Sequence, residues 1–220
     1  ILNFENSGKK LFSIVKNYKL YDYLNLELNK NKFFKIKKNI SKTITKKYNL
    51  VINCDVNSFF SKKYFYKKFN KNYNSYAYTT IIDHKELLNN CATQIFTKNG
   101  PIAFLPISST KTSVVYSVRG SQNIDLNNEI NKYNSKYFIL KINEIFNFEL
   151  QSIDLRSYHF QNILAFGELL HKIHPLAGQG FNMSIRDIKL LMDLIKVRLD
   201  NGLELDDSVC IDFEKKTKEK

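Results

Sequence analysis

Alternating hydrophobic and polar residues in the middle of the chain predict a run of strands. The segments 76–82, 93–97, 102–105 and 113–118 are rich in β-branched and aromatic residues, and Gly, Pro or Ser-Ser-Thr breaks separate them. Strands joined by such short breaks run antiparallel, so this block predicts an antiparallel sheet.

Apolar residues at helical spacing predict helices over 9–30, 126–133, 137–146 and 181–199. The last of these is the clearest, and we expect its apolar stripe to pack on a core. The stripe consists of Phe181, Ile185, Ile188, Met192, Ile195 and Leu199. Gly202 ends this helix, and the tail 215–220 is polar and basic. The segments 33–37 and 41–45 predict a short hairpin, and 148–155 is predicted to be extended.

Two short apolar runs, 50–55 and 163–168, each end on an acid, Asp55 and Glu168. Open α/β sheets bind ligands at the carboxyl ends of their strands, where a carboxylate can accept hydrogen bonds from sugar or ribitol hydroxyls. The alternative is that both acids only close turns after the strands.

A glycine-rich turn, 178–180, directly precedes the predicted helix 181–199. Glycine lets a ligand approach the backbone, and a helix N-terminus favours negative charge, so the junction is a candidate cofactor cradle. His171 and His174 lie just upstream; a histidine beside a turn has either a structural role or a role in proton transfer, and no catalytic residue is assigned.

The composition and charge of the chain limit the kinds of binding partner that we expect. The chain has 220 residues, 43% of them apolar, and no apolar run long enough to span a bilayer. The net charge of +13 comes largely from lysines interspersed with Asn, Ile, Phe and Tyr, which A/T-rich codons specify. We therefore interpret it as a solvated surface, with anionic lipid as an alternative and nucleic acid disfavoured. Three widely spaced cysteines predict neither disulfides nor a zinc site, and favour a reducing cytosol.

The segment 163–187 resembles the motif GDxxHxxxPxxGQGxN of FAD-dependent aromatic-ring hydroxylases, and most of all that of the ubiquinone-biosynthesis hydroxylases, which act on polyprenyl phenols. Glu168 stands where the family has Asp. The other matching positions are Gly167, His171, Pro175, Gly178, Gln179, Gly180 and Asn182.

Three upstream segments add to the resemblance. Residues 100–106, GPIAFLP, are similar to the family's GPLALLP strand, and 14–17, IVKN, to its IVEN segment. The segment 55–62 resembles the family's DGxxSxxR motif, which contacts the flavin pyrophosphate and NAD(P)H. It keeps Asp55 but has Val56 for Gly and Lys62 for Arg. The family's N-terminal GxGxxG unit is not found, so we expect a fragment that lacks it.

The resemblance implies an α/β (α+β) fold, with a partial FAD-binding domain and an antiparallel substrate domain. The expected divisions are 1–66 and 159–220 for the FAD-binding domain and 67–158 for the substrate domain. The implied cofactor-binding residues are Asp55, Gly167, Glu168, Pro175, Gly178, Gln179, Gly180, Phe181 and Asn182. The implied substrate-binding residues are Pro101, Phe104 and Pro106, and no metal ligand is expected.

The implied activity is hydroxylation of a polyprenyl phenol, in which NAD(P)H reduces FAD and a flavin C4a-hydroperoxide formed with O2 transfers oxygen. The expected partner is a hydrophobic aromatic small molecule, and the expected location is the cytoplasm, with association to the inner membrane or to a biosynthetic complex as an open alternative. Another flavoprotein of this architecture, such as a reductase or halogenase, and a non-catalytic binding or remnant protein are the competing hypotheses.

Overall fold

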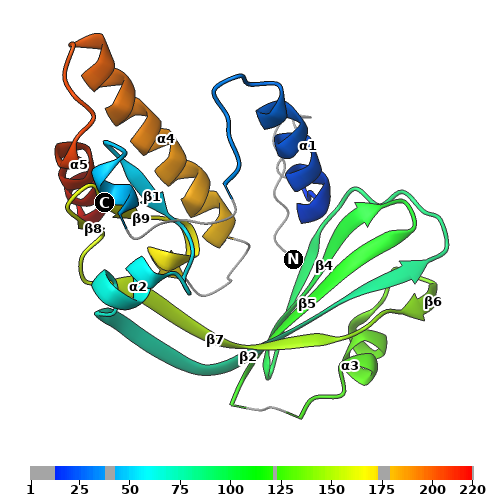
Figure 1. Cartoon of the computed structure of the whole chain (residues 1–220). Helices are drawn as coiled ribbons and strands as arrows, with labels where there is room; N and C mark the ends of the chain where they lie inside the picture. The colour runs from blue at the N-terminus through cyan, green and yellow to red at the C-terminus, as the bar shows by residue number, and fades with distance from the viewer. Residues whose placement is uncertain (1–12, 38–42, 121–122, 173–178, 220) are drawn as a thin grey trace. The chain divides into compact units, whose positions relative to one another are not determined.

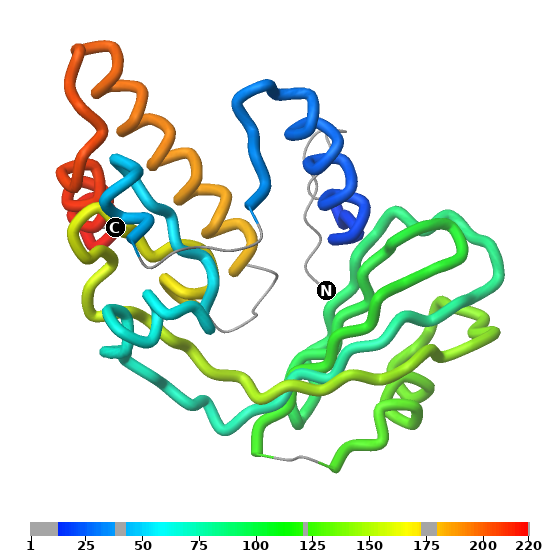
Figure 2. The backbone as a smooth tube through the Cα atoms, viewed as in Figure 1, coloured from blue at the N-terminus to red at the C-terminus, as the bar shows by residue number. Residues whose placement is uncertain are grey.

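The computed structural model describes residues 13–37, 43–120, 123–172 and 179–219, which form two compact units (Figure 1). Unit 1 consists of residues 1–37 and 76–148, and unit 2 of residues 38–75 and 149–220. Figure 2 traces the chain as it leaves unit 2 along one long strand and returns to it along another. These divisions differ from the expected boundaries at 66/67 and 158/159, which stay a prediction.

Unit 1 is built on an antiparallel sheet. The strands and helices associated with this unit are α1 Asn17–Asn29, β2 Lys68–His84, β3 Thr93–Thr97, β4 Gly100–Ser108, β5 Lys111–Arg119, α3 Leu126–Tyr133 and β6 Ile139–Ile142. In the sheet β2, β5, β4 and β3 follow one another, and β6 pairs with the other edge of β2. Figure 1 shows β4 and β5 side by side. The antiparallel sheet predicted from the sequence is confirmed.

The core of unit 1 lies on one face of the sheet, where every second side chain of β5 and, on β4, Ile102 and Phe104 are buried. Helix α3 contributes Leu126 and Ile130 to this core, and its N-cap Asp125 accepts hydrogen bonds from the backbone N–H groups of Asn127 and Asn128. The strand alternation therefore decides which side chains face α3 and which face the opposite side.

Unit 2 contains a small sheet covered by helices. Its elements are η1 Ile44–Lys46, β1 Val51–Asn53, α2 Phe59–Tyr64, β7 Phe146–Leu155, β8 His159–Phe160, β9 Ile163–Ala165, η2 Gly167–Leu169, β10 His171–Lys172, α4 Gln179–Asp200 and α5 Asp207–Lys218. Three strands form the sheet in the order β1-β9-β8, in which β1 and β9 run parallel with Asn53 opposite Ala165. Strand β10 pairs with the end of β7.

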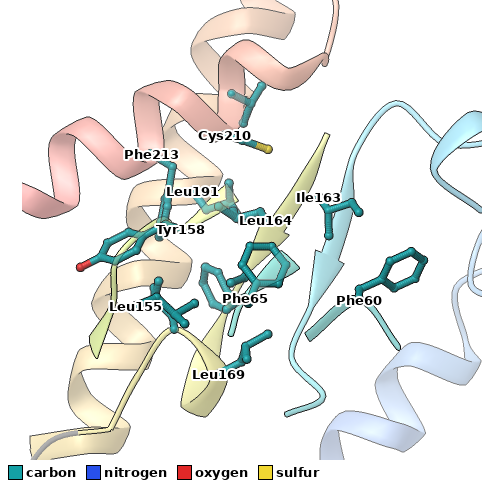
Figure 3. Packing of buried hydrophobic residues seen from close by; sticks show 14 of the residues in the cluster. Phe60, Phe65, Leu155, Tyr158, Ile163, Leu164, Leu169, Leu191, Cys210 and Phe213 are labelled. Carbon is teal, nitrogen blue, oxygen red and sulfur yellow. The ribbon is translucent and has the colours of Figure 1, made fainter. Parts of the chain in front are cut away.

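The core of unit 2 forms where β9 meets α4 and α5, which pack against each other. Figure 3 shows Leu164 on β9, Leu191 on α4 and Phe213 on α5 in this cluster, with Phe65 beside them. Cys210 lies in the same cluster, and burial raises the pKa of its thiol to about 12, so it is a packing residue and not a nucleophile.

Leu164→Ala should lower the free energy of unfolding of unit 2 by about 2–5 kcal/mol, because it leaves a cavity at a position that is 0% exposed. Its partner in the parallel register, Ile52, is 47% exposed, so Ile52→Ala should cost less than about 1 kcal/mol. Urea denaturation followed by circular dichroism measures both, and equal losses would show that Leu164 is not a core residue.

Two predictions of local structure were wrong. Residues 33–37 form no strand and 44–46 form a 3-10 helix, so the described part of the expected hairpin is absent. The segment 137–146, predicted to be helical, contains β6, because pairing with β2 overrides its helical spacing. Residues 215–218 of the basic tail, in addition, belong to a helix: α5 begins at Asp207 behind the N-cap Asp206 and contributes Phe213 to the core.

The helix over 181–199 is confirmed as α4, but its buried side is not the predicted one. Phe181, Ile185 and Met192 are exposed, and Asp187, Leu191 and Leu194 are buried instead. The buried residues also recur at helical spacing, and Leu191 and Leu194 belong to the hydrophobic cluster that includes α5. From the predicted stripe, Ile195 is half-buried against the same cluster. Periodicity thus identified the helix, but the neighbouring elements decide which face is covered.

Candidate functional site

Asp55 and Glu168 leave the same edge of the sheet in unit 2. They follow the parallel strands β1 and β9, whose last paired residues are Asn53 and Ala165, and the backbone N–H of Phe166 donates to the carbonyl of Asn53 at 3.0 Å. Both acids are exposed. Two acids at neighbouring carboxyl ends of parallel strands are therefore available to hydroxyl groups of a ligand.

The turn after β1 shows that Asp55 can both close a turn and remain available to a ligand. Its Oδ1 accepts a hydrogen bond from the backbone N–H of Asn57 at 2.8 Å, which closes the turn. The side chain is nonetheless exposed, so a turn-closing carboxylate can still meet a ligand with its outer oxygen.

Three polar residues that the sequence pattern did not single out hold this turn in place. The amide Nδ2 of buried Asn53 donates to Ser61 Oγ at 2.8 Å, and Ser58 Oγ donates to Asn53 Oδ1 at 3.1 Å. Ser58 is also the N-cap of α2 and accepts from the N–H of Ser61. The signal for this network was the serine three residues after Asp55, a common N-cap residue at a helix start.

The backbone conformation at Gly167, shortly after β9, explains why a glycine stands at this position. Its φ of +62° lies in the left-handed region, and a Cβ built there would meet nothing within 4 Å. The glycine is thus needed for backbone conformation and not for space. It turns the chain into η2, which carries Glu168.

The N-terminal end of helix α4 carries no acidic side chain that would occupy its free N–H groups in place of a ligand. Its first turn contains no acidic residue, and Gly180, Phe181 and Asn182 are exposed. A helix of 22 residues concentrates partial positive charge on its first N–H groups, so this end favours a negatively charged group. The predicted residues Pro175 and Gly178, the side chain of Gln179, and also His174, lie outside the described residues.

His171 stands next to α4 and not in open solvent. Its Nε2 lies 3.0 Å from Asp187 Oδ2, and the two side chains are 8% and 11% exposed. Across the β7–β10 pair, His171 lies opposite Asp154, which accepts a hydrogen bond from the Tyr158 hydroxyl at 3.0 Å. Burial, and then Asp154, raises the pKa of Tyr158, so this phenol stays protonated.

The three expected substrate-binding residues lie on β4 in unit 1, but they do not share one surface. Phe104 is 2% exposed and stacks on Tyr137 with ring centroids 5.9 Å apart, on the side covered by α3. Pro101 has the opposite parity in the strand and points to the other face, whereas Pro106 has the parity of Phe104. A common wall of Pro101 and Phe104 is therefore excluded by strand alternation.

Within the described ranges, no helix is long and apolar enough to cross a membrane. In the same part of the chain, no group of three or more His, Cys, Asp and Glu side chains is placed to hold a metal ion. All three cysteines are free, and Cys54 and Cys91 are exposed.

No family model matches the chain. Curated relatives do. The chain is 30% identical over 112 residues to the 3-demethoxyubiquinol 3-hydroxylase of Escherichia coli, covering 46% of this chain and 28% of that protein. It is 22% identical over 142 residues to the ubiquinone hydroxylase UbiL of Rhodospirillum rubrum, covering 60% and 33%. It is 26% identical over 160 residues to the human ubiquinone biosynthesis monooxygenase COQ6, covering 53% and 34%.

Solved structures show the fold. A variant of Klebsiella pneumoniae HpxO complexed with FAD aligns at a TM-score of 0.58 and 12% identity, covering 76% of this chain and 47% of that one. The flavin-dependent halogenase CmlS aligns at 0.57 and 15%, covering 77% and 34%. The probable FAD-dependent monooxygenase pqsL of Pseudomonas aeruginosa aligns at 0.54 and 16%, covering 76% and 51%.

These likenesses confirm the fold class and the resemblance predicted from 163–187. The chain spans between 28% and 34% of the length of the three curated relatives. Over that part, its sequence is similar to ubiquinone-biosynthesis hydroxylases, and its fold is similar to that of FAD-dependent monooxygenases and halogenases.

Proposed function

We propose that this chain is part of a FAD-dependent monooxygenase that hydroxylates a polyprenyl phenol in ubiquinone biosynthesis, using NAD(P)H and O2. The observation that carries the proposal is the coincidence of two independent features. The sequence is similar to hydroxylases whose names place them in ubiquinone biosynthesis, and unit 2 has the strand, acid and helix-start arrangement that a nucleotide cofactor needs.

The residues of unit 2 fit part of FAD. Asp55 and Glu168 offer exposed carboxylates to ribitol or pyrophosphate-side hydroxyl groups, and the acid-free first turn of α4 offers N–H groups to negative charge. When bound, FAD would supply the electron transfer and the oxygen activation of the reaction. The proposed cofactor residues therefore include Gly167, Gly180, Phe181 and Asn182, with Pro175, Gly178 and Gln179 added by the sequence motif.

The chain's own contribution to catalysis would be binding and electrostatics. The helix N-terminus would stabilise negative charge that accumulates on a reduced ring system, and it needs no reorganisation because its dipole is fixed by the fold. The apolar strand β4 would supply the substrate side, with half-buried Pro101 on the face opposite the core and Phe104 supporting the strand from the core. We further propose peripheral association with a membrane, because a polyprenyl chain partitions into lipid.

The test begins with flavin. The full natural protein that contains this chain, purified with FAD supplied, should be yellow and should oxidise NAD(P)H faster when a polyprenyl phenol is added. Mass spectrometry with 18O2 should then show one labelled oxygen in the aromatic product. A yellow protein without labelled product would point to another flavoprotein activity, and a colourless protein would refute the proposal in favour of a binding or remnant protein.

A further inference from the structure

The first two turns of α4, which carry the proposed cofactor contacts, are anchored by very little. From Gly180 to Arg186 no side chain is buried, and the buried stripe of the helix begins only at Asp187, followed by Leu191 and Leu194. Asp187 is therefore the buried contact nearest to the helix's N-terminal end.

Among the described residues, Asp187 lies in contact with His171. Their nearest atoms lie 3.0 Å apart, and within the described ranges neither His171 Nε2 nor Asp187 Oδ2 has a properly oriented hydrogen-bond partner. The short distance shows that the two side chains are in contact, although the angle is not that of a hydrogen bond. In the part of the chain that the structure describes, no lysine or arginine forms an ion pair with Asp187.

Other acidic side chains lie near the contact between His171 and Asp187. Asp154 lies opposite His171 in the β7–β10 register, and Glu214 of α5 accepts the backbone N–H of Tyr158. His171 thus faces acids from β7 and from α4, while a third acid, on α5, stands beside Tyr158. Without the imidazole, the largely buried carboxylate of Asp187 would lose this polar neighbour, and a buried polar group without a partner is unfavourable.

We infer that His171 and Asp187 are positioning residues that tie α4 to β10 and so fix the N-terminal end of α4 where the cofactor is proposed to bind. The inference rests on the proposed function, since it assigns the pair a purpose in holding FAD. Neither side chain is placed in contact with the cofactor, and each acts through the helix.

The experiment uses the full natural protein and the variants His171→Gln, Asp187→Asn and the double variant. Asp193→Asn is the matched control, because it removes a carboxylate from an exposed position of the same helix. Each of the first three should raise the Kd for FAD about tenfold or more, as loss of one partner of a buried pair does. The double variant should lose no more than either single one, since the two side chains act as one contact. Asp193→Asn should leave the Kd unchanged.

Hydrogen exchange in FAD-free protein provides a second measurement that does not depend on cofactor binding. Amides 183–186 should exchange faster in the pair variants, while amides 191–198 stay close to the wild type. Unchanged Kd values in a protein that binds FAD, or faster exchange throughout unit 2, would overturn the positioning role. If the wild type binds no FAD, the proposed function fails, and local exchange at 183–186 alone then decides whether the pair positions the helix.

Discussion

Gly100→Ala is expected to unfold unit 1 or to lower its free energy of unfolding by about 4 kcal/mol or more, among the largest effects of a single methyl group. A Cβ at this position would lie 2.0 Å from the carbonyl oxygen of Ser117 on the neighbouring strand. The φ of Gly100 is +142°, which L residues rarely adopt, so strain adds to the clash. Backbone atoms of β5 would have to move, and the β4–β5 pairing would be lost.

Gly120→Ala is the matched control for this prediction. Gly120 follows β5, has a φ of +72°, and its Cβ would meet nothing within 4 Å. Only the conformational cost remains, which is about 1–2 kcal/mol for an L residue in the left-handed region. Urea denaturation of both variants, followed by near-ultraviolet circular dichroism of the tyrosines, compares the two. If both lost the same stability, the close approach of Gly100 to Ser117 would have no energetic weight.

Gly180→Ala is expected to weaken FAD binding about 10- to 100-fold, because a methyl group forced into a close contact costs about 1–3 kcal/mol. Gly180→Val should abolish binding. Gly180 is exposed in the first turn of α4, where its backbone is helical, so alanine should preserve or improve the stability of the FAD-free protein. Loss of affinity without loss of stability is the signature of a residue kept small for a ligand.

Gly202→Ala should give the opposite pattern. Gly202 ends α4 with a φ of +68°, and the N–H of the next residue, Leu203, closes the helix on the carbonyl of Arg198 at 2.9 Å. Alanine there should cost about 1 kcal/mol of stability and leave FAD affinity unchanged. Fluorescence titration with FAD and thermal melting of both variants test the pair. Unchanged FAD affinity in Gly180→Ala would remove Gly180 from the proposed cofactor contacts.

The strands of unit 1 were the most predictable part of the fold. β3 and α3 have the predicted bounds, because turn residues flank them and their patterns are local. Which face of α4 is covered could not be predicted, because it depends on packing against α5. The basic residues at the end of the chain gave no sign that a helix there would contribute to the core. Residues 137–146 have helical spacing but contain the strand β6, which forms because it pairs with β2, far away in the sequence.

The candidate site was predicted in part. Asp55 and Glu168 were placed correctly at the ends of strands, because an apolar run followed by an acid is a local signal. The family resemblance grouped Phe104 with Pro101 as substrate-binding residues. The two side chains point to opposite faces of the sheet, however, because they are three residues apart on the same strand. The pairing of His171 with Asp187 could not be read from composition, since a histidine beside a turn has many partners available. Only the geometry shows that the histidine contacts the helix.

The interleaving of the two units has a consequence for how the protein is made. All residues of unit 1 precede residue 149, whereas unit 2 needs residues 149–220 to pair β9 with β1. On the ribosome, strands β2, β5, β4 and β3 can therefore pair with one another before β9, the parallel neighbour of β1, has been made. Such long-range parallel pairing is slow to form. A chaperone or a low temperature during expression should thus benefit unit 2 more than unit 1, and premature termination before Ile163 should leave a folded sheet attached to an unpaired strand.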